Sequence, residues 1–170
     1  ATHVRTVKKY ESGIVKDPIT IESTELIEDL VKLTSELNIS GMPVVDDGIL
    51  KGIVTSRDFR YADNLNESVS SIMTPLDRLI TVDEGTNQDK VKKLMYQNRI
   101  EKVLVLDKAG SLSGLVTMKD IDKSAEFPLA TKDNSGQLLV AAALGTGADT
   151  FDRAEALNVV GVDAVSYTHL

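Results

Sequence analysis

The chain has 170 residues, of which 42% are hydrophobic and 26% are charged, a composition that is ordinary for a globular protein with a core of its own. Its formal net charge of −7 argues against general binding to nucleic acid or to anionic membranes, because both require a basic surface. The absence of cysteine excludes disulfides and thiolate chemistry, and the two histidines, His3 and His169, do not have the spacing of a zinc motif.

Membrane and export signals are missing from the sequence. No apolar stretch approaches the roughly 20 residues that span a bilayer. The first ten residues lack the apolar segment of a signal peptide. We therefore expect a cytoplasmic protein with no membrane contact.

The first repeat of the sequence begins after a polar, basic stretch, residues 1–13, which we expect to be a connector. Residues 18–21 form a short extended segment, and Ser23 or Thr24 can cap the helix that follows and ends near Asn38. Apolar residues of this helix recur at helical spacing: Leu26, Ile27, Leu30, Val31, Leu33 and Leu37.

A hairpin follows this helix. Two β-rich runs, residues 41–45 and 50–55, flank the turn at residues 46–48, and Asp-Gly in such a turn is a strong hairpin signal. A short helix should begin just after Thr55. A polar stretch, residues 62–70, then closes the first repeat.

The same order of elements recurs in the next part of the chain. The expected elements are a strand at 79–82, a helix at 86–98, a strand at 100–106, a strand at 112–117 and a short helix at 118–123. The second hairpin turn is one residue longer than the first, and turns are where insertions are expected. We therefore expect two repeats of the order β-α-β-β-α, which pack as a pseudo-symmetric pair because neither small sheet can bury its apolar face alone.

One phrase occurs in both repeats. It reads Gly-Ile-Val-Thr-Ser-Arg-Asp at residues 52–58 and Gly-Leu-Val-Thr-Met-Lys-Asp at residues 114–120. A single Thr-x-x-Asp is usually only a helix cap, in which the hydroxyl caps a backbone N–H and the acid lies in the first turn. Two copies in matched surroundings favour a shared chemical role as well.

That role is the binding of a nucleoside phosphate. A helix N-terminus and a hydroxyl suit a phosphate group, and an Asp one turn later suits a ribose diol. The candidate residues are Thr55 and Asp58 in the first repeat, and Thr117 and Asp120 in the second. Their cationic neighbours, Arg57 and Lys119, are either ligand contacts or ordinary solvated charges. We expect Thr55, Asp58, Thr117 and Asp120 to lie near one another in a cleft between the repeats.

The last part of the chain has a different pattern. An apolar run at 138–144, a helix at 150–159 and a strand at 162–165 indicate a βαβ unit. Such a unit begins a parallel α/β system that needs more strands than are present. We therefore expect the chain to stop within a domain.

The repeated unit, with Pro-Ile-Thr-Ile, Ile-Ser-Gly-Met-Pro-Val-Val and the Thr-x-x-Asp phrase, resembles a cystathionine-β-synthase (CBS) domain. Two such units resemble the tandem pair called a Bateman module. The resemblance implies an α+β pair that binds adenosine or guanosine nucleotides, such as ATP, AMP or GTP, and forms homo-oligomers through the pairs. It matches Asp58 and Asp120 to ribose contacts, Thr55 and Thr117 to phosphate contacts, and Lys102 to a phosphate-binding cation.

Flanking phrases at residues 7–13, 72–75, 99–105 and 139–149 resemble bacterial IMP dehydrogenase. In that family a CBS pair is inserted into a (β/α)8 barrel that oxidises IMP to XMP with NAD and a monovalent cation. The resemblance implies a connector at 1–13, CBS repeats at 14–66 and 67–124, and a partial barrel segment at 125–170. It also implies a truncated chain.

The chain departs from that family in two ways. Residues 166–170 do not follow the family pattern, and no segment matches the catalytic Cys loop or the IMP-phosphate loops. We therefore expect no catalytic residue, no metal site and no cofactor in this chain, and no turnover of IMP. Three hypotheses stay open: a regulatory nucleotide-binding pair, a pair that serves only oligomerisation or docking, and a segment of an active NAD-dependent dehydrogenase.

Overall fold

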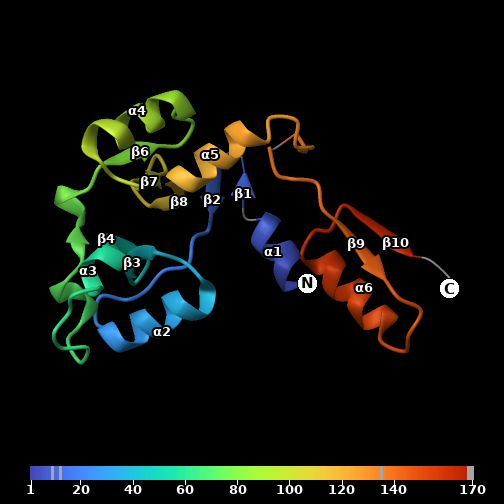
Figure 1. Cartoon of the computed structure of the whole chain (residues 1–170), viewed down its shortest axis with the longest axis horizontal. Helices are drawn as coiled ribbons and strands as arrows, with labels where there is room; N and C mark the ends of the chain where they lie inside the picture. The colour runs from blue at the N-terminus through green and yellow to red at the C-terminus, as the bar shows by residue number, and fades with distance from the viewer. Residues whose placement is uncertain (9, 12, 135, 168–170) are drawn as a thin grey trace. The chain divides into compact units, whose positions relative to one another are not determined.

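The computed structural model describes residues 1–8, 10–11, 13–134 and 136–167. The chain divides into two compact units, one of residues 17–115 and one of residues 1–16 together with 116–170. Short helices and short strands build both units (Figure 1), which confirms the predicted mixed α/β class.

The first half of unit 17–115 is a small sheet with a helix packed on it. Its elements are α2 (Ile27–Leu37), β3 (Gly41–Asp46), β4 (Ile49–Thr55), α3 (Ser56–Phe59) and β5 (Thr74–Pro75). Strands β3 and β4 form the predicted hairpin, with Gly41 opposite Thr55 and Asp46 opposite Ile49, and β5 pairs with the other edge of β4. The Asp-Gly turn lies where the sequence predicts it.

The core of this half lies between α2 and the sheet. Leu30 of α2 is fully buried with Met42, Val44 and Val54 of the hairpin, and Ile21 joins them. Ile21 forms an isolated bridge to Val44, so the extended segment predicted at 18–21 pairs with the sheet at this one position. The helical periodicity therefore identifies the packing face correctly at its centre, whereas Leu26 and Leu37 at its ends are exposed.

The start of α2 differs from the prediction. The residue before the helix is Leu26, which makes no side-chain cap, and neither Ser23 nor Thr24 is in the cap position. Ser23 instead donates from its backbone N–H and from its hydroxyl to the Asp46 carboxylate, at 2.8 and 2.7 Å. The hydroxyl thus ties the approach to α2 to the end of β3. The helix ends as predicted, with Asn38 in the left-handed conformation (φ 51°).

The hydrogen bonds from Ser23 to Asp46 make the stability of the protein depend on pH. The two hydrogen bonds from Ser23 hold the pKa of Asp46 below its ordinary value. A lowered folded-state pKa stabilises the protein above the unfolded-state pKa of about 4, and the contribution disappears as the pH falls through the folded-state value. We expect the urea midpoint to fall less between about pH 7 and about pH 3 in Asp46→Asn than in the wild type. Asp63→Asn, at an exposed position, should fall as much as the wild type, and an equal fall in all three proteins would contradict the assignment.

The second half of unit 17–115 repeats the plan with a helix of the same length and slightly shorter hairpin strands. They are β6 (Thr81–Asp83), α4 (Gln88–Asn98), β7 (Lys102–Leu106) and the first part of β8 (Leu112–Thr117), which crosses into the other unit. Strand β6 runs parallel to β7, with Val82 opposite Val105. Two one-turn 3-10 helices that the sequence did not predict, η1 (Val69–Ser71) and η2 (Leu76–Arg78), lie between the halves in sequence.

The buried residues of this half lie mainly on α4 and β7. Val91 and Met95 of α4 and Val103, Leu104 and Val105 of β7 are all buried. Helix α4 begins two residues later than predicted, at Gln88, because Asn87 caps it by accepting from the backbone N–H of Asp89. It ends at Asn98, as predicted.

The other unit combines both ends of the chain. Its elements are α1 (Thr2–Lys8), β1 (Tyr10–Glu11), β2 (Ile14–Lys16), α5 (Met118–Glu126), β9 (Ala141–Leu144), α6 (Thr150–Val159) and β10 (Ala164–Tyr167). Residues 1–13 were expected to be a connector. They instead contain a helix and the start of a hairpin. Residues 9 and 12 of this predicted connector lie outside the described residues.

The predicted βαβ unit is present. Strands β9 and β10 are parallel, with Ala141 opposite Ala164, and α6 has the predicted bounds. Strand β9 starts at Ala141, later than predicted. Strand β10 extends to Tyr167, so two of the five residues that depart from the family pattern continue the strand, and residues 168–170 lie outside the described residues.

An ion pair joins the two ends of the chain within this unit. The Lys8 ammonium lies 2.5 Å from the Asp163 carboxylate, which also accepts from the backbone N–H of Val140 at 2.7 Å. These bonds hold the pKa of Asp163 below its ordinary value, first through Lys8 and then through Val140. Helix α1 is thereby tied to the start of β10.

Candidate functional site

The Thr-x-x-Asp phrase has the same local geometry in both repeats. The Thr55 hydroxyl donates to Asp58 Oδ2 at 2.8 Å, and the Thr117 hydroxyl donates to Asp120 Oδ2 at 2.6 Å. In the first copy the backbone N–H of Thr55 also donates to Asp58 Oδ2, at 2.7 Å. All four residues are half-buried. Each pair caps the helix that follows, so the capping interpretation holds for both copies.

The two helices differ in length, and this affects what they can bind. Helix α3 is a single turn of four residues, whereas α5 has nine. A helix dipole is the sum of aligned peptide dipoles, so one turn contributes little positive charge. Cationic side chains must therefore supply most of the attraction for an anion at the first copy.

One such cation reaches the first copy from the second repeat. Lys102, at the start of β7, donates from its ammonium group to the Ser40 hydroxyl at 2.7 Å. Ser40 lies just before β3, and its carbonyl accepts from the backbone N–H of Ser56 at 2.9 Å. Lys102 therefore contacts the segment that packs beside Thr55. All of these residues belong to unit 17–115.

Gly41 makes this close packing possible. Its φ is +148°, and a Cβ atom there would lie 2.5 Å from the Val54 carbonyl oxygen and 2.8 Å from Thr55 Cα. A glycine with this backbone conformation lets the two strands meet at their ends. The position of Ser40 relative to Thr55 is thus fixed by contact of backbone with backbone.

The remaining predicted cations are more exposed. Arg57 lies 4.0 Å from the Glu101 carboxylate, and both side chains are more than 60% exposed. Such a pair contributes little to stability. Lys119 is exposed at the start of α5. Both observations are compatible with solvated charges and with ligand contacts, so the sequence-based alternatives for these two residues stay open.

The structure therefore brings part of the predicted site together. Thr55, Asp58 and Lys102 share one surface of unit 17–115 with Arg57, while Thr117, Lys119 and Asp120 belong to the other unit. A single cleft lined by both phrases stays a prediction.

Sequence reasoning missed Ser40, although a signal exists. At the repeat offset of 61, Ser40 and Gly41 correspond to Glu101 and Lys102. Equivalent positions of a pseudo-symmetric pair tend to meet near the pseudo-twofold axis. The contact of Lys102 with Ser40 and the approach of Arg57 to Glu101 both involve these positions.

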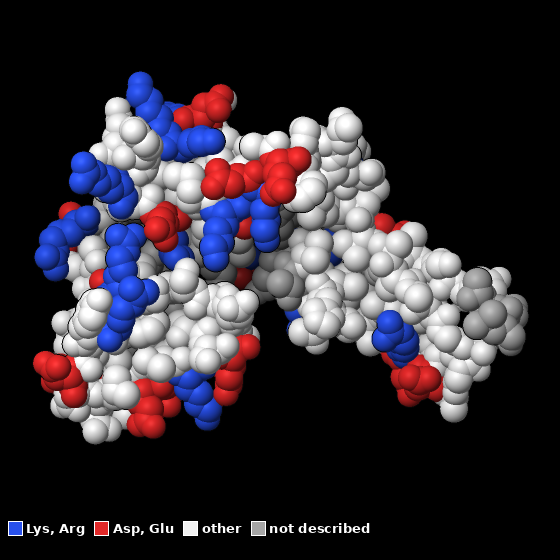
Figure 2. Space-filling model, in the orientation of Figure 1, with Lys and Arg blue, Asp and Glu red and all other residues white. Residues whose placement is uncertain are grey.

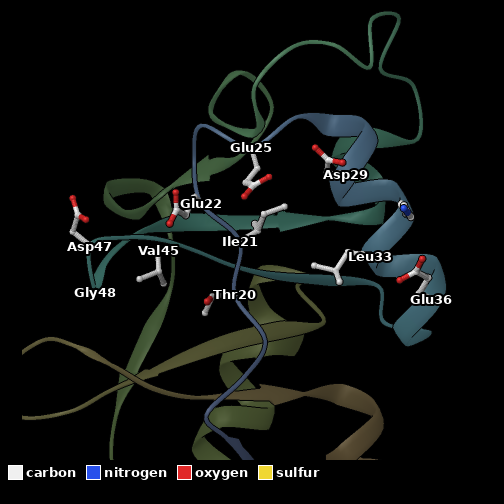
Figure 3. Close-up of a pocket in the computed structure, with 11 residues that line it drawn as sticks. Thr20, Ile21, Glu22, Glu25, Asp29, Leu33, Glu36, Val45, Asp47 and Gly48 are labelled. Atoms are coloured by element: carbon white, nitrogen blue, oxygen red, sulfur yellow. The ribbon is translucent and has the colours of Figure 1, made fainter.

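An open hollow of about 730 Å³ lies elsewhere in the same unit (Figure 3). Its lining residues come from the segment before α2, from α2 itself and from the far end of the hairpin: Thr20, Ile21, Glu22, Glu25, Asp29, Lys32, Leu33, Glu36, Val45, Asp47 and Gly48. Five of them are acidic, which disfavours a phosphate. Because Thr55 pairs with Gly41 at the opposite end of the hairpin from Asp47, this hollow is separate from the candidate site.

Charges of both signs are interspersed over the visible face around α2, α4 and α5, and the face around α6 and β10 is mostly uncharged (Figure 2). No group of three or more acidic or histidine side chains in the described ranges could hold a metal ion. Over the same ranges, no helix has both the length and the apolar character that crossing a bilayer requires.

Comparison with known proteins identifies both repeats. The family model for the CBS domain matches residues 7–64 and residues 69–125. The chain is 42% identical to the inosine-5'-monophosphate dehydrogenase of Streptococcus pyogenes serotype M3 over 168 residues, and 42% identical to that of Haemophilus influenzae over 166 residues. Each alignment covers 97% of this chain and 34% of the relative. The chain thus spans about a third of these enzymes.

Solved structures match the chain over nearly its whole length. GMP reductase from Trypanosoma brucei in complex with guanosine 5'-triphosphate matches with a TM-score of 0.81 at 28% identity, covering 98% of this chain and 41% of that chain. The complex of the same enzyme with guanosine 5'-monophosphate matches with a TM-score of 0.79, also at 28% identity and over 98% of this chain and 36% of that chain.

Proposed function

The chain belongs to the CBS-domain family, and on that premise we propose that it is the nucleotide-binding regulatory pair of an IMP dehydrogenase-like protein. Its ligand is an adenosine or guanosine nucleotide. It works in the cytoplasm and regulates a dehydrogenase that oxidises IMP with NAD and a monovalent cation. The catalytic groups of that reaction belong to sequence outside the matched third.

The contact of Lys102 with Ser40 is the observation that supports this proposal most directly. It places a cation of the second repeat on the segment beside Thr55 of the first, 2.7 Å from a hydroxyl. A phosphate needs such a cation because α3 is too short to supply much charge. Asp58, one turn after Thr55, uses Oδ2 for the cap, and among the described residues its Oδ1 accepts no hydrogen bond. That oxygen can accept from a ribose hydroxyl.

Arg57 and Lys119 complete the proposed set as additional phosphate contacts, and Thr117 and Asp120 form the equivalent contacts of the second repeat. The relatives support a purine nucleotide. Inosine-5'-monophosphate dehydrogenase and GMP reductase are both named for purine nucleotides, and the latter has been solved with guanosine 5'-triphosphate. We extend this ligand class to the present chain by similarity.

A second function competes with the first. The Thr-Asp pairs already bond to each other as helix caps, which is all that a pair without ligand would require of them. In that case the CBS pair acts only as an oligomerisation or docking element. The homo-oligomer is part of both proposals, so its formation does not separate them.

Calorimetric titration of the 170-residue chain with ATP, AMP and GTP does separate them. We expect heat of binding from at least one nucleotide, together with a rise in Tm. A ligand present at about 100 times its Kd stabilises the folded state by about 2.7 kcal/mol. Sodium triphosphate is the matched control for the nucleoside, and it should bind more weakly. No heat and no thermal shift at millimolar nucleotide would leave the docking element as the better proposal.

The chain alone should not oxidise IMP. It has no cysteine to act as a nucleophile, and it spans about a third of the dehydrogenases that it resembles. The measurement is NADH formation with IMP and NAD, with one of those longer relatives as the positive control. Turnover by the isolated chain would contradict the assignment of catalysis to other sequence.

A further inference from the structure

We propose that Ser40 is a further binding residue of the nucleotide site, whose hydroxyl acts with the Lys102 ammonium as a single phosphate contact made by both repeats. This inference rests on the proposed function and names a residue that the Thr-x-x-Asp phrase does not contain. The juxtaposition of Ser40 and Lys102 across 62 residues of sequence carries it.

The chemistry of the pair suits an anion. The Ser40 hydroxyl accepts the hydrogen bond from Lys102, so its own proton can be donated to another acceptor. The ammonium group and the hydroxyl are 2.7 Å apart, so both can donate hydrogen bonds to oxygens of the same phosphate group. Lysine binds phosphate as a point charge and sets no direction, and a neighbouring hydroxyl adds the direction that it lacks.

The place of the pair suits a nucleotide that Thr55 and Asp58 also hold. The Ser40 carbonyl accepts from Ser56, the residue after Thr55, and Gly41 packs its backbone against Thr55. Ser40 is exposed, and Lys102 is half-buried. A ligand can therefore reach the hydroxyl from solvent while the backbone that carries it stays fixed.

The donor groups around Ser40 suit phosphate better than a cation as the ligand. Lys102 and Arg57 supply two positive charges to this surface, and the carboxylate nearest to Arg57, that of Glu101, already pairs with it at 4.0 Å. Asp58 Oδ2 is used by Thr55. The Lys102 ammonium and the Ser40 hydroxyl are N–H and O–H donors, which are the groups that anion recognition requires.

The test is a double-mutant cycle measured by calorimetry with ATP and GTP on the 170-residue chain. The variants are Ser40→Ala, Lys102→Met and the double variant, with Ser40→Thr as the conservative variant that keeps the hydroxyl. Ser35→Ala, at an exposed position of α2, is the matched control. Urea unfolding of each variant shows whether it folds.

We expect Ser40→Ala to weaken binding about tenfold, because a hydrogen bond to a charged group is lost. Ser40→Thr and Ser35→Ala should bind like the wild type. The double variant should bind about as weakly as Lys102→Met, because the two groups act as one contact.

Other results overturn the inference in distinguishable ways. If the wild type binds and Ser40→Ala binds equally well, or if the losses of the two single variants multiply in the double variant, Ser40 does not share a phosphate with Lys102. A loss in Ser40→Ala that Ser40→Thr does not restore would assign the effect to the backbone. A wild type that binds neither nucleotide overturns the proposed function itself.

Discussion

Gly41→Ala should lower the free energy of unfolding by roughly 2 to 6 kcal/mol. The φ of +148° favours glycine, and forcing another residue into such a conformation costs about 1–3 kcal/mol. The new Cβ would also meet the Val54 carbonyl oxygen at 2.5 Å and Thr55 Cα at 2.8 Å, and such overpacking costs about 1–3 kcal/mol more. Both neighbours are backbone atoms of β4, so neither can move aside by changing rotamer.

Two other glycines of the same hairpin separate these two costs. Gly48 has a positive φ of +78° but open space around the position of a Cβ, so Gly48→Ala should show the conformational cost alone. At Gly52 a Cβ would lie 2.3 Å from the Thr74 carbonyl oxygen of β5, so Gly52→Ala should show mainly the steric cost. The loss in Gly41→Ala should approach the sum of the other two. Urea unfolding at one temperature measures all three.

A small effect of Gly41→Ala, no larger than that of Gly48→Ala, would mean that β3 and β4 separate easily at this end. The Ser40 segment would then not be fixed against Thr55. The stability measurement therefore also tests a premise of the binding site, without any ligand.

Sequence reasoning succeeded for elements whose signal is local. The Asp-Gly turn predicts the β3–β4 hairpin, and the repeat offset transfers that prediction to β7 and β8, whose C-terminal ends at Leu106 and Thr117 agree with the prediction. The Thr-x-x-Asp phrase predicts where α3 and α5 begin, because the capping bonds join residues three positions apart.

It failed where a distant residue competes for a local group. Ser23 or Thr24 was expected to cap α2. The N–H and the hydroxyl of Ser23 instead donate to the Asp46 carboxylate, 23 positions away in sequence. The helix α1 was not expected because residues 1–8 have few apolar positions, and its Lys8 pairs with Asp163 at the far end of the chain. The contact between Ser40 and Lys102 likewise spans 62 positions. Local patterns carry no information on such pairs unless the repeat symmetry is used to align them.

Asp58→Asn should reduce nucleotide affinity by about 10- to 100-fold, because a hydrogen bond to a charged acceptor contributes about 1.5–3 kcal/mol. The asparagine can still place its side-chain oxygen where the N–H and hydroxyl of Thr55 donate, at 2.7 and 2.8 Å in the wild type. The helix cap should therefore persist with a loss of at most about 1 kcal/mol. A large change in binding with a small change in stability is the expected result. Asp120→Asn should act in the same way on the second repeat, and each variant should remove one site from the measured stoichiometry.

The ribose hydroxyl provides the decisive comparison, because Asp58 has two candidate roles. If its carboxylate binds the ribose, the wild type should prefer ATP or GTP over the matching 2'-deoxynucleotide, and Asp58→Asn should lose most of that preference. If Asp58 only caps α3, the variant should bind both nucleotides with the same proportional loss, because a displaced α3 does not distinguish the two sugars. Asp122→Asn, at an exposed position of α5, controls for the loss of one negative charge. An unchanged preference in Asp58→Asn would remove the ribose contact from the proposed site and leave Thr55 and Asp58 as a helix cap.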